Sequence, residues 1–221
     1  TATNTSTTPT ATATATNTST TPTATATATN TPIVEIKQYY ISSASNGRVD
    51  DVRYSDEDIL LYDIATDTWS MIFDGSDVKV GRTDLDAFFI NEDGSILMSF
   101  VHPVNFPAPL GKVDDSDIVR FIPTQLGKTT VGTFELYFDG SDVGLSAGNE
   151  DIDTFGFTPD GRLLISTYGR VEVPGVSARD EDLLVFTATS LGDNTQGTWE
   201  LYFDGSDVDL TNGGEDVNAL F

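Results

Sequence analysis

The stretch "FDGSDV" occupies residues 73–78, and the same six letters return at residues 138–143 and 203–208. The copies start at residues 73, 138 and 203, which is a spacing of 65 residues both times. An Asp followed by Gly-Ser-Asp favours a turn in which the Asp side chain accepts a backbone hydrogen bond from two residues further on. The sequence therefore predicts one acidic turn that occurs three times.

Four segments with alternating apolar residues recur around each turn, a pattern typical of strands. The clearest copy reads "EDIDTFGFTPDG", "RLLISTYG", "DEDLLVFTATSLG" and "GTWELYFDGSDV", and the copy before it reads "TDLDAFFINEDG", "SILMSFVH", "DSDIVRFIPTQLG" and "GTFELYFDGSDV". The pairs Asp93-Gly94 and Asp160-Gly161 lie between the first and second segments and predict tight hairpin turns. No segment has a long helical period, so we expect an all-β fold.

The third copy is divided between the two ends of the chain. It begins with "EDVNALF" at residues 215–221 and continues with "KQYYISSAS" at residues 37–45 and "DEDILLYDIATDTWSMIFDGSDV" at residues 56–78. The interval from Ser42 to Asp58 equals that from Ser166 to Asp182, which supports this alignment. We therefore expect three circularly offset repeats, with a strand at about residues 36–43 that completes a repeat begun by a C-terminus.

The phrase "FTPDGRLL" at residues 157–164, set within four predicted antiparallel strands, resembles a blade of a β-propeller. The resemblance covers residues 33–221 and implies that the first strand of each repeat is innermost and the fourth outermost. Three blades are fewer than the roughly four to eight that usually close a ring. Two chains could contribute three blades each to one ring. The chain could instead belong to a longer repeat polypeptide, or complete the open repeat of its neighbour head to tail. As a further alternative, the three repeats could form a threefold β barrel of the trefoil or prism kind.

Residues 1–32 have a different composition. They read "TATNTSTTPTATA" twice and then "TATNTP", without a charged or aromatic side chain, so they cannot build a core. We expect an extended segment stiffened by proline, followed by a β-repeat domain over residues 33–221. Thr-rich tracts with Pro resemble the O-glycosylated stalks of secreted and cell-surface proteins, which predicts an extracellular or cell-surface location. The chain begins at Thr1 rather than Met, so we expect a mature or partial chain.

The expected glycan acceptors are the threonines of this tract and the asparagines of its two Asn-x-Ser triplets. An unmodified flexible linker is the alternative. The acceptors are Thr1, Thr3, Thr5, Thr7, Thr8, Thr10, Thr12, Thr14, Thr16, Thr18, Thr20, Thr21, Thr23, Thr25, Thr27, Thr29, Thr31, Asn4 and Asn17.

The charge of the chain excludes several kinds of partner. Eleven basic and 35 acidic residues give a net charge of −24, which repels phosphate backbones and anionic lipids, so we expect no nucleic acid partner. No apolar run reaches the roughly 18 residues that a membrane span needs. Cysteine is absent, so disulfides and thiolate metal sites are absent too.

Closely spaced carboxylates suit calcium, a hard cation that prefers oxygen ligands. The expected ligands come from each acidic turn and the acidic segment after it, although hydrogen-bonded turns without metal would explain the same Asp residues, and the spacing is not that of an EF-hand. The predicted ligands are Asp74, Asp77, Asp84, Asp139, Asp142, Asp151, Asp204, Asp207 and Asp216.

The sequence contains no catalytic signature, and we expect that the protein is not an enzyme. His102 is the only histidine, and neither a nucleophile elbow nor a phosphate-binding glycine loop is present. We expect a structural protein that self-associates into a glycosylated multimeric or fibrous surface assembly, with repeats completed by strand exchange between termini. The alternative is a calcium-dependent ligand- or carbohydrate-binding module on a glycosylated stalk.

Overall fold

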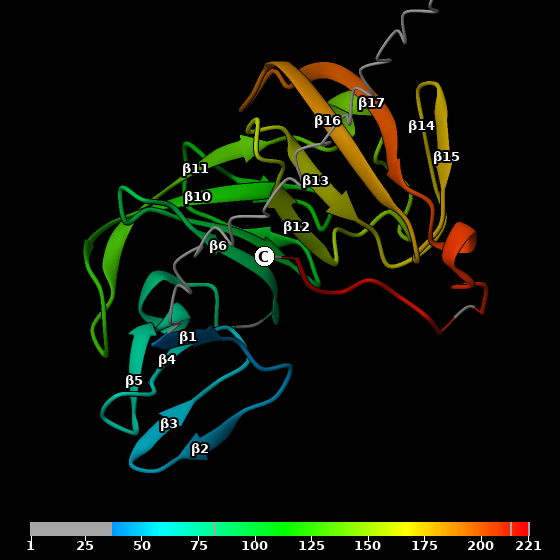
Figure 1. Cartoon of the computed structure of the whole chain (residues 1–221). Coiled ribbons are helices and arrows are strands. Elements are labelled where there is room, and N and C mark those ends of the chain that lie inside the picture. Colours follow the sequence, from blue (N-terminus) through cyan, green and yellow to red (C-terminus); the bar gives the residue numbers. More distant parts are fainter. Residues whose placement is uncertain (1–36, 82, 213, 221) are drawn as a thin grey trace, which may run out of the picture. The chain divides into compact units, whose positions relative to one another are not determined.

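The computed structural model describes residues 37–81, 83–212 and 214–220 (Figure 1). The chain divides into two units, Thr1–Glu35 and Ile36–Phe221, and all described residues belong to the second. The Thr-rich tract, its glycan acceptors and the predicted boundary after residue 32 lie outside the described residues.

Three antiparallel sheets carry the repeats, as the sequence pattern predicts. The first sheet has the order β1 (Gln38–Ile41), β4 (Ile59–Asp63) and β5 (Thr68–Phe73). The second has the order β6 (Leu85–Ile90), β7 (Ile96–Phe100), β10 (Ile118–Gln125) and β11 (Val131–Phe138). The third has the order β12 (Thr154–Phe157), β13 (Leu163–Ser166), β16 (Leu183–Ser190) and β17 (Gln196–Phe203). The prediction of an all-β fold is confirmed.

The described residues form neither a closed barrel nor a closed propeller, so both arrangements stay predictions. In each repeat a small hairpin fills the long connection between the second and third strands. The hairpins are β2 (Gly47–Val49) with β3 (Val52–Tyr54), β8 (Val104–Asn105) with β9 (Lys112–Val113), and β14 (Val171–Val173) with β15 (Val176–Ala178).

The two predicted hairpin turns are confirmed. Gly94 and Gly161 have φ values of 82° and 83°, in the left-handed region that glycine adopts without strain. The Gly94 backbone N–H donates to Asn91 O at 2.9 Å, and that of Gly161 donates to Thr158 O at 2.8 Å. These turns set the register of β6 with β7 and of β12 with β13.

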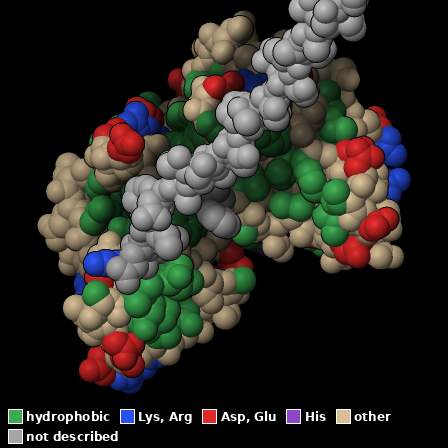
Figure 2. Space-filling model, in the orientation of Figure 1, with side chains coloured by type: hydrophobic (Ala, Val, Ile, Leu, Met, Phe, Trp, Pro, Cys, Tyr) green, Lys and Arg blue, Asp and Glu red, His purple; other side chains and the backbone are tan. Residues whose placement is uncertain are grey.

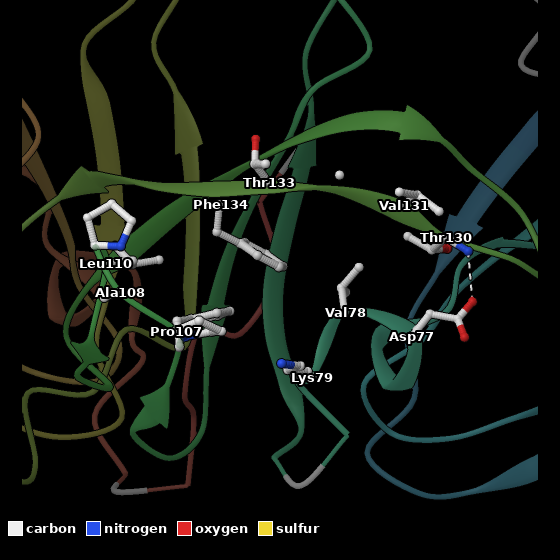
Figure 3. A pocket seen from close by; sticks show the side chains of 13 residues that line it. Asp77, Val78, Lys79, Pro107, Ala108, Leu110, Thr130, Val131, Thr133 and Phe134 are labelled. Carbon is white, nitrogen blue, oxygen red and sulfur yellow. Dashed lines mark hydrogen bonds between the residues drawn. The ribbon is translucent and has the colours of Figure 1, made fainter.

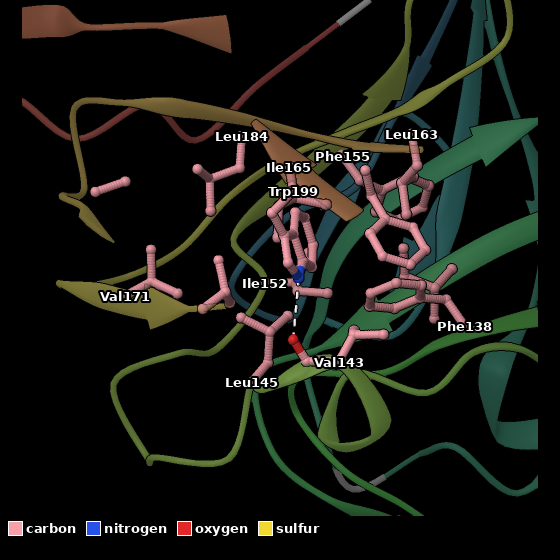
Figure 4. Packing of buried hydrophobic residues seen from close by; sticks show 14 of the residues in the cluster. Phe138, Val143, Leu145, Ile152, Phe155, Leu163, Ile165, Val171, Leu184 and Trp199 are labelled. Carbon is pink, nitrogen blue, oxygen red and sulfur yellow. Dashed lines mark hydrogen bonds between the residues drawn. The ribbon is translucent and has the colours of Figure 1, made fainter. Parts of the chain in front are cut away.

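The core lies between neighbouring sheets. One cluster joins Ile59 and Phe73 of the first sheet to Phe100 and Phe121 of the second. Another cluster joins the second sheet to the third, and Figure 4 shows its packing around Phe138 and Trp199. The indole N–H of Trp199 donates to Val143 O at 3.0 Å, which satisfies the polar atom of this buried ring.

Each "FDGSDV" copy ends a fourth strand and turns through a short 3-10 helix. These helices are η1 (Gly75–Val78), η2 (Ser141–Val143) and η3 (Gly205–Val208). A buried Asp in the connection before the third strand holds each turn: one carboxylate oxygen accepts from the turn glycine N–H and the other from a backbone N–H three residues earlier. The bonds are Asp58 with Gly75 (3.0 Å) and Ser55 (2.7 Å), Asp117 with Gly140 (3.0 Å) and Asp114 (2.8 Å), and Asp182 with Gly205 (2.9 Å) and Arg179 (2.8 Å).

The turn glycine is required because the chain passes so close to this connection. A Cβ at Gly140 would lie 2.2 Å from Ser116 O, and a Cβ at Gly205 would lie 2.4 Å from Glu181 O. At Gly75 a Cβ would lie 2.5 Å from Glu57 Cγ. The acidic turn therefore recurs because each repeat needs the same close approach and the same carboxylate bridge.

We predict that Gly140→Ala destabilises the protein by about 2–4 kcal/mol, because the new methyl group forces the turn away from Ser116 and breaks the bond to Asp117. Gly140 has a φ of −66°, which any residue adopts, so the cost arises from the contact alone. Urea unfolding measures the effect. Gly148→Ala is the control, since its Cβ meets nothing within 4 Å. Equal stability of the two variants would contradict the close approach.

Candidate functional site

The first Asp of each acidic turn accepts hydrogen bonds within the turn. The side chains of Asp74, Asp139 and Asp204 accept from the serine hydroxyl two residues on, at 2.6, 2.7 and 2.6 Å. Asp204 also accepts from Ser206 N at 3.0 Å. These bonds explain the first Asp of the motif without a metal ion.

The second Asp of the turn connects neighbouring repeats. Asp77 accepts from Thr130 N at 2.8 Å, and Asp142 accepts from Thr195 N at 3.0 Å. Each threonine hydroxyl accepts in return from the backbone N–H of the first turn Asp, at 2.9 and 3.0 Å. The equivalent Asp207 is exposed.

A different set of carboxylates gathers where the first strand of each repeat begins. Here the backbone N–H of an apolar residue donates a hydrogen bond to a backbone carbonyl of the preceding repeat. The bonds are Leu85 N–H to Asp56 O (3.1 Å), Ile152 N–H to Asp115 O (3.2 Å) and Val217 N–H to Asp180 O (3.1 Å). Leu85 and Ile152 are buried, and Val217 is partly buried. Acidic residues flank these positions, in the triplets Asp84-Leu85-Asp86, Asp151-Ile152-Asp153 and Asp216-Val217-Asn218. The repeated N–H bond thus places the flanking carboxylates of successive repeats close together.

Four of these carboxylates, those of Asp86, Asp151, Asp153 and Asp216, line a cavity of about 540 Å³, which we call the acidic cavity. No Lys or Arg lines it. Its lining consists of Asp86, Val101, His102, Asp115, Gly148, Asp151, Asp153, Tyr168, Asp216 and Asn218.

Three of these side chains are arranged as a metal site requires. One oxygen each of Asp86, Asp151 and Asp153 lies within 4.8 Å of the other two, and this is the only such group of three acidic or histidine side chains in the described part of the chain. Asp86, Asp151, Asp153 and Asp216 each bury a carboxylate oxygen without a hydrogen-bond partner, and no other buried side-chain oxygen or nitrogen of the described residues lacks one.

Burial and mutual repulsion raise the pKa of these acids. Desolvation, followed by the Asp151 charge, raises the pKa of Asp86 to about 7. Desolvation and the charges of Asp115 and Asp153 raise that of Asp151 to about 7. The pKa of Asp153 is raised to about 8 by desolvation and by its contact with the Asp216 carboxyl. The cavity therefore gathers carboxyl groups that hold their protons to near-neutral pH, and no Lys or Arg of its lining compensates their charge when they ionise.

The predicted ligands divide into two groups in the structure. Asp151 and Asp216 line the acidic cavity, and Asp84 lies near it, with a pKa raised by burial and by Asp56. The six turn residues belong to no such three-carboxylate group among the described residues. Asp86 and Asp153, which form the three-carboxylate group with Asp151, were not among the predicted ligands. The signal was present, because residues on either side of a buried strand residue point to the same face.

Two surface grooves recur in successive repeats. The first measures about 380 Å³, and Figure 3 shows Phe134 of β11 directed into it, between the loop with Pro107 and the turn with Val78. A groove of about 370 Å³ lies at the equivalent place in the next repeat, where Trp199 replaces Phe134. The same groove occurs at the equivalent place in two successive repeats. It therefore results from how the small hairpin of each repeat packs against the fourth strand, and does not indicate a single binding site.

Comparisons with known proteins do not assign the chain to a family. No protein-family model, curated protein or solved structure matches the chain. Among the described residues, no helix has the length and apolar character needed to cross a membrane.

We predict that the metal-free protein loses stability as pH rises from about 5 to about 8. The folded-state pKa values of Asp86 and Asp151 are raised to about 7, so the folded state binds more protons than the unfolded chain over this range, and the free energy of unfolding falls as they leave. Urea unfolding in EDTA at several pH values measures the slope.

The double variant Asp86→Asn/Asp151→Asn should show a shallower decline, because two of the titrating groups are gone. His102, which also lines the cavity, is present in both proteins. A decline equally steep in the variant and in the wild type would contradict the assignment.

Proposed function

We propose that the chain is an extracellular structural protein whose β repeats are completed by strand addition between copies. The observation that carries this proposal is the second edge of β1, which pairs with no other strand of the described residues. Self-association at this edge would build a multimeric or fibrous assembly, because every copy offers both an edge and a strand.

The edge of β1 differs from the equivalent strands of the other two sheets. β7 and β13 pair on both sides and are buried at every residue, whereas β1 pairs only with β4 among the described strands and is exposed at all four residues. Tyr39, Tyr40 and Ile41 are 49%, 43% and 37% exposed. Figure 2 shows hydrophobic side chains gathered on the surface over β1. An unpaired edge with exposed aromatic side chains favours the addition of a further strand.

The segment Asp216–Leu220 is the candidate strand. Its Val217 donates to Asp180 O as Leu85 and Ile152 donate in the preceding repeats, so it starts where a first strand starts. It pairs with no strand of the described residues. By sequence equivalence with β12 and β13, this segment would pair antiparallel with β1 of a second copy.

Blade-like repeats are the arrangement that best fits the sheets. The two four-stranded sheets follow the same antiparallel order, and their first strands lie side by side, with the Phe89 and Phe157 rings 5.0 Å apart. Packing of neighbouring sheets through their faces, with first strands together, is what a propeller requires. We therefore favour circularly offset propeller-like repeats over a threefold barrel.

We predict that the chain self-associates with rising concentration, and that Tyr39→Lys raises the dissociation constant by roughly tenfold or more, since a charge on an edge strand opposes pairing. Light scattering coupled to size-exclusion chromatography measures the mass. Tyr202→Lys is the matched control, because Tyr202 is 50% exposed on β17. A wild type that stays monomeric at high concentration, or variants that associate equally, would refute the proposal.

The extracellular location rests on the Thr-rich tract. We predict that native protein carries O-linked sugars on several of residues Thr1–Thr31, with Asn4 and Asn17 as secondary acceptors, because the tract offers hydroxyls without a core to bury them. Intact-mass measurement of native material before and after deglycosylation gives the mass of the attached sugars directly. A native mass equal to that of the unmodified polypeptide would remove the support for a glycosylated stalk.

The acidic cavity favours a second candidate function, a calcium-dependent ligand- or carbohydrate-binding module. The exposed Tyr168 ring, 67% accessible, stands beside the carboxylates and offers a surface on which a sugar could stack. This candidate requires a cation in the cavity, and the absence of calcium binding there would exclude it.

A further inference from the structure

We propose that Asp86, Asp151 and Asp153 bind one calcium ion in the acidic cavity, with Asp216 beside them. This site differs from the turn-based site expected from the sequence and does not depend on self-association. It arises between repeats, because the third residue of one acidic triplet meets the first residue of the next: Asp86 faces Asp151, and Asp153 faces Asp216.

The spacing of the carboxylates fits a single ion. Calcium binds oxygen at about 2.3–2.6 Å, so two ligands of one ion lie at most about 5 Å apart. The ligand oxygens of Asp86, Asp151 and Asp153 all lie within 4.8 Å of one another. Three carboxylates from two segments, one with Asp86 and one with Asp151 and Asp153, can therefore contact the same ion.

The unpartnered oxygens point to a ligand independently of this spacing. Asp153 is only 8% exposed, yet its buried Oδ2 has no hydrogen-bond partner. The other buried oxygens without a partner belong to Asp86, Asp151 and Asp216 around the same cavity. Buried polar atoms are almost always satisfied in native proteins, so four exceptions at one place mark oxygens that are free to bind a cation.

Other buried carboxylates of this chain do not share this property. Asp58, Asp117 and Asp182 are buried to a similar degree, but each accepts two backbone N–H bonds. The acidic cavity therefore does not reflect a general excess of acid on the chain. Each of its carboxylates at Asp86, Asp151, Asp153 and Asp216 keeps one buried oxygen without a hydrogen-bond partner.

The ligand chemistry selects the metal. The cluster supplies only carboxylate oxygens, and the chain has no cysteine, which favours hard cations over zinc or copper. Calcium takes six to eight oxygen ligands in flexible geometry, and a cavity of about 540 Å³ leaves room for water to complete its shell. Magnesium demands a stricter octahedron and serves as the comparison ion.

The experiment uses the full chain, stripped with EDTA and exchanged into metal-free buffer. Isothermal titration with calcium chloride and with magnesium chloride measures binding, and thermal melts at matched ionic strength measure the stabilisation. We expect millimolar or tighter calcium binding and a melting temperature raised by several degrees, because the ion binds the folded state alone. Magnesium should bind more weakly.

Three charge-matched variants locate the ion. Asp153→Asn should weaken calcium binding by about tenfold or more and abolish the melting shift, whereas Asp193→Asn, at an exposed loop position, should leave both unchanged. Asp207→Asn, in the third acidic turn, tests whether calcium binds at the turns instead of in the acidic cavity. The melt of metal-free Asp153→Asn shows whether the variant folds.

Two outcomes would overturn the proposal. No calcium binding by the wild type, or equal binding by all three variants, would leave the cavity as a solvated acidic hollow. Loss of binding in Asp207→Asn with retention in Asp153→Asn would place the ion at the acidic turn.

Discussion

A buried aspartate that bridges two loops is the interaction on which the architecture depends. In each repeat, Asp58, Asp117 or Asp182 accepts from a turn glycine 17 or 23 residues further along the chain. The bond joins the connection before the third strand to the end of the fourth strand. Loss of the aspartate side chain would leave the buried glycine N–H without an acceptor, a cost of about 1–3 kcal/mol, and would also remove the acceptor of a partly buried N–H. The bridge also fixes where the next repeat can begin.

The same geometry brings the mutually repelling carboxylates of the acidic cavity together. The connection that carries the bridging Asp also accepts the backbone N–H that starts the next first strand, through Asp56 O, Asp115 O and Asp180 O. Because each first strand is preceded or opened by one or two acidic residues, the bridges bring Asp86, Asp151, Asp153 and Asp216 to the cavity. A net charge of −24 leaves few cations on the chain to neutralise them. A cation from solvent would relieve this repulsion and join successive repeats at their first strands.

Much of the fold could be predicted from local sequence pattern. Alternation of apolar residues and the Asp-Gly pairs at residues 93–94 and 160–161 specify strands and hairpin turns, because both depend on backbone conformation within a few residues. The small hairpins β2–β3, β8–β9 and β14–β15 were not predicted. Their strands are two or three residues long, too short for a period to show.

The candidate site could be predicted only in part for a physical reason. The sequence shows which residues are acidic, but the role of each Asp depends on whether a backbone N–H from a distant loop reaches it. Asp142 finds such a donor in Thr195, 53 residues away, whereas Asp153 finds none. The acidic turns are identical in all three repeats, whereas the triplets differ from one repeat to the next. The carboxylates that the structure leaves unpaired are the less conspicuous set.

Anomalous X-ray scattering from a crystal of the chain soaked in a lanthanide that replaces calcium tests the central claim most directly. We predict one strong anomalous peak among the carboxylates of Asp86, Asp151 and Asp153, with metal–oxygen distances near those of calcium, about 2.3–2.6 Å. Peaks confined to the acidic turns at Asp74, Asp139 and Asp204, or an acidic cavity without a peak, would contradict the account.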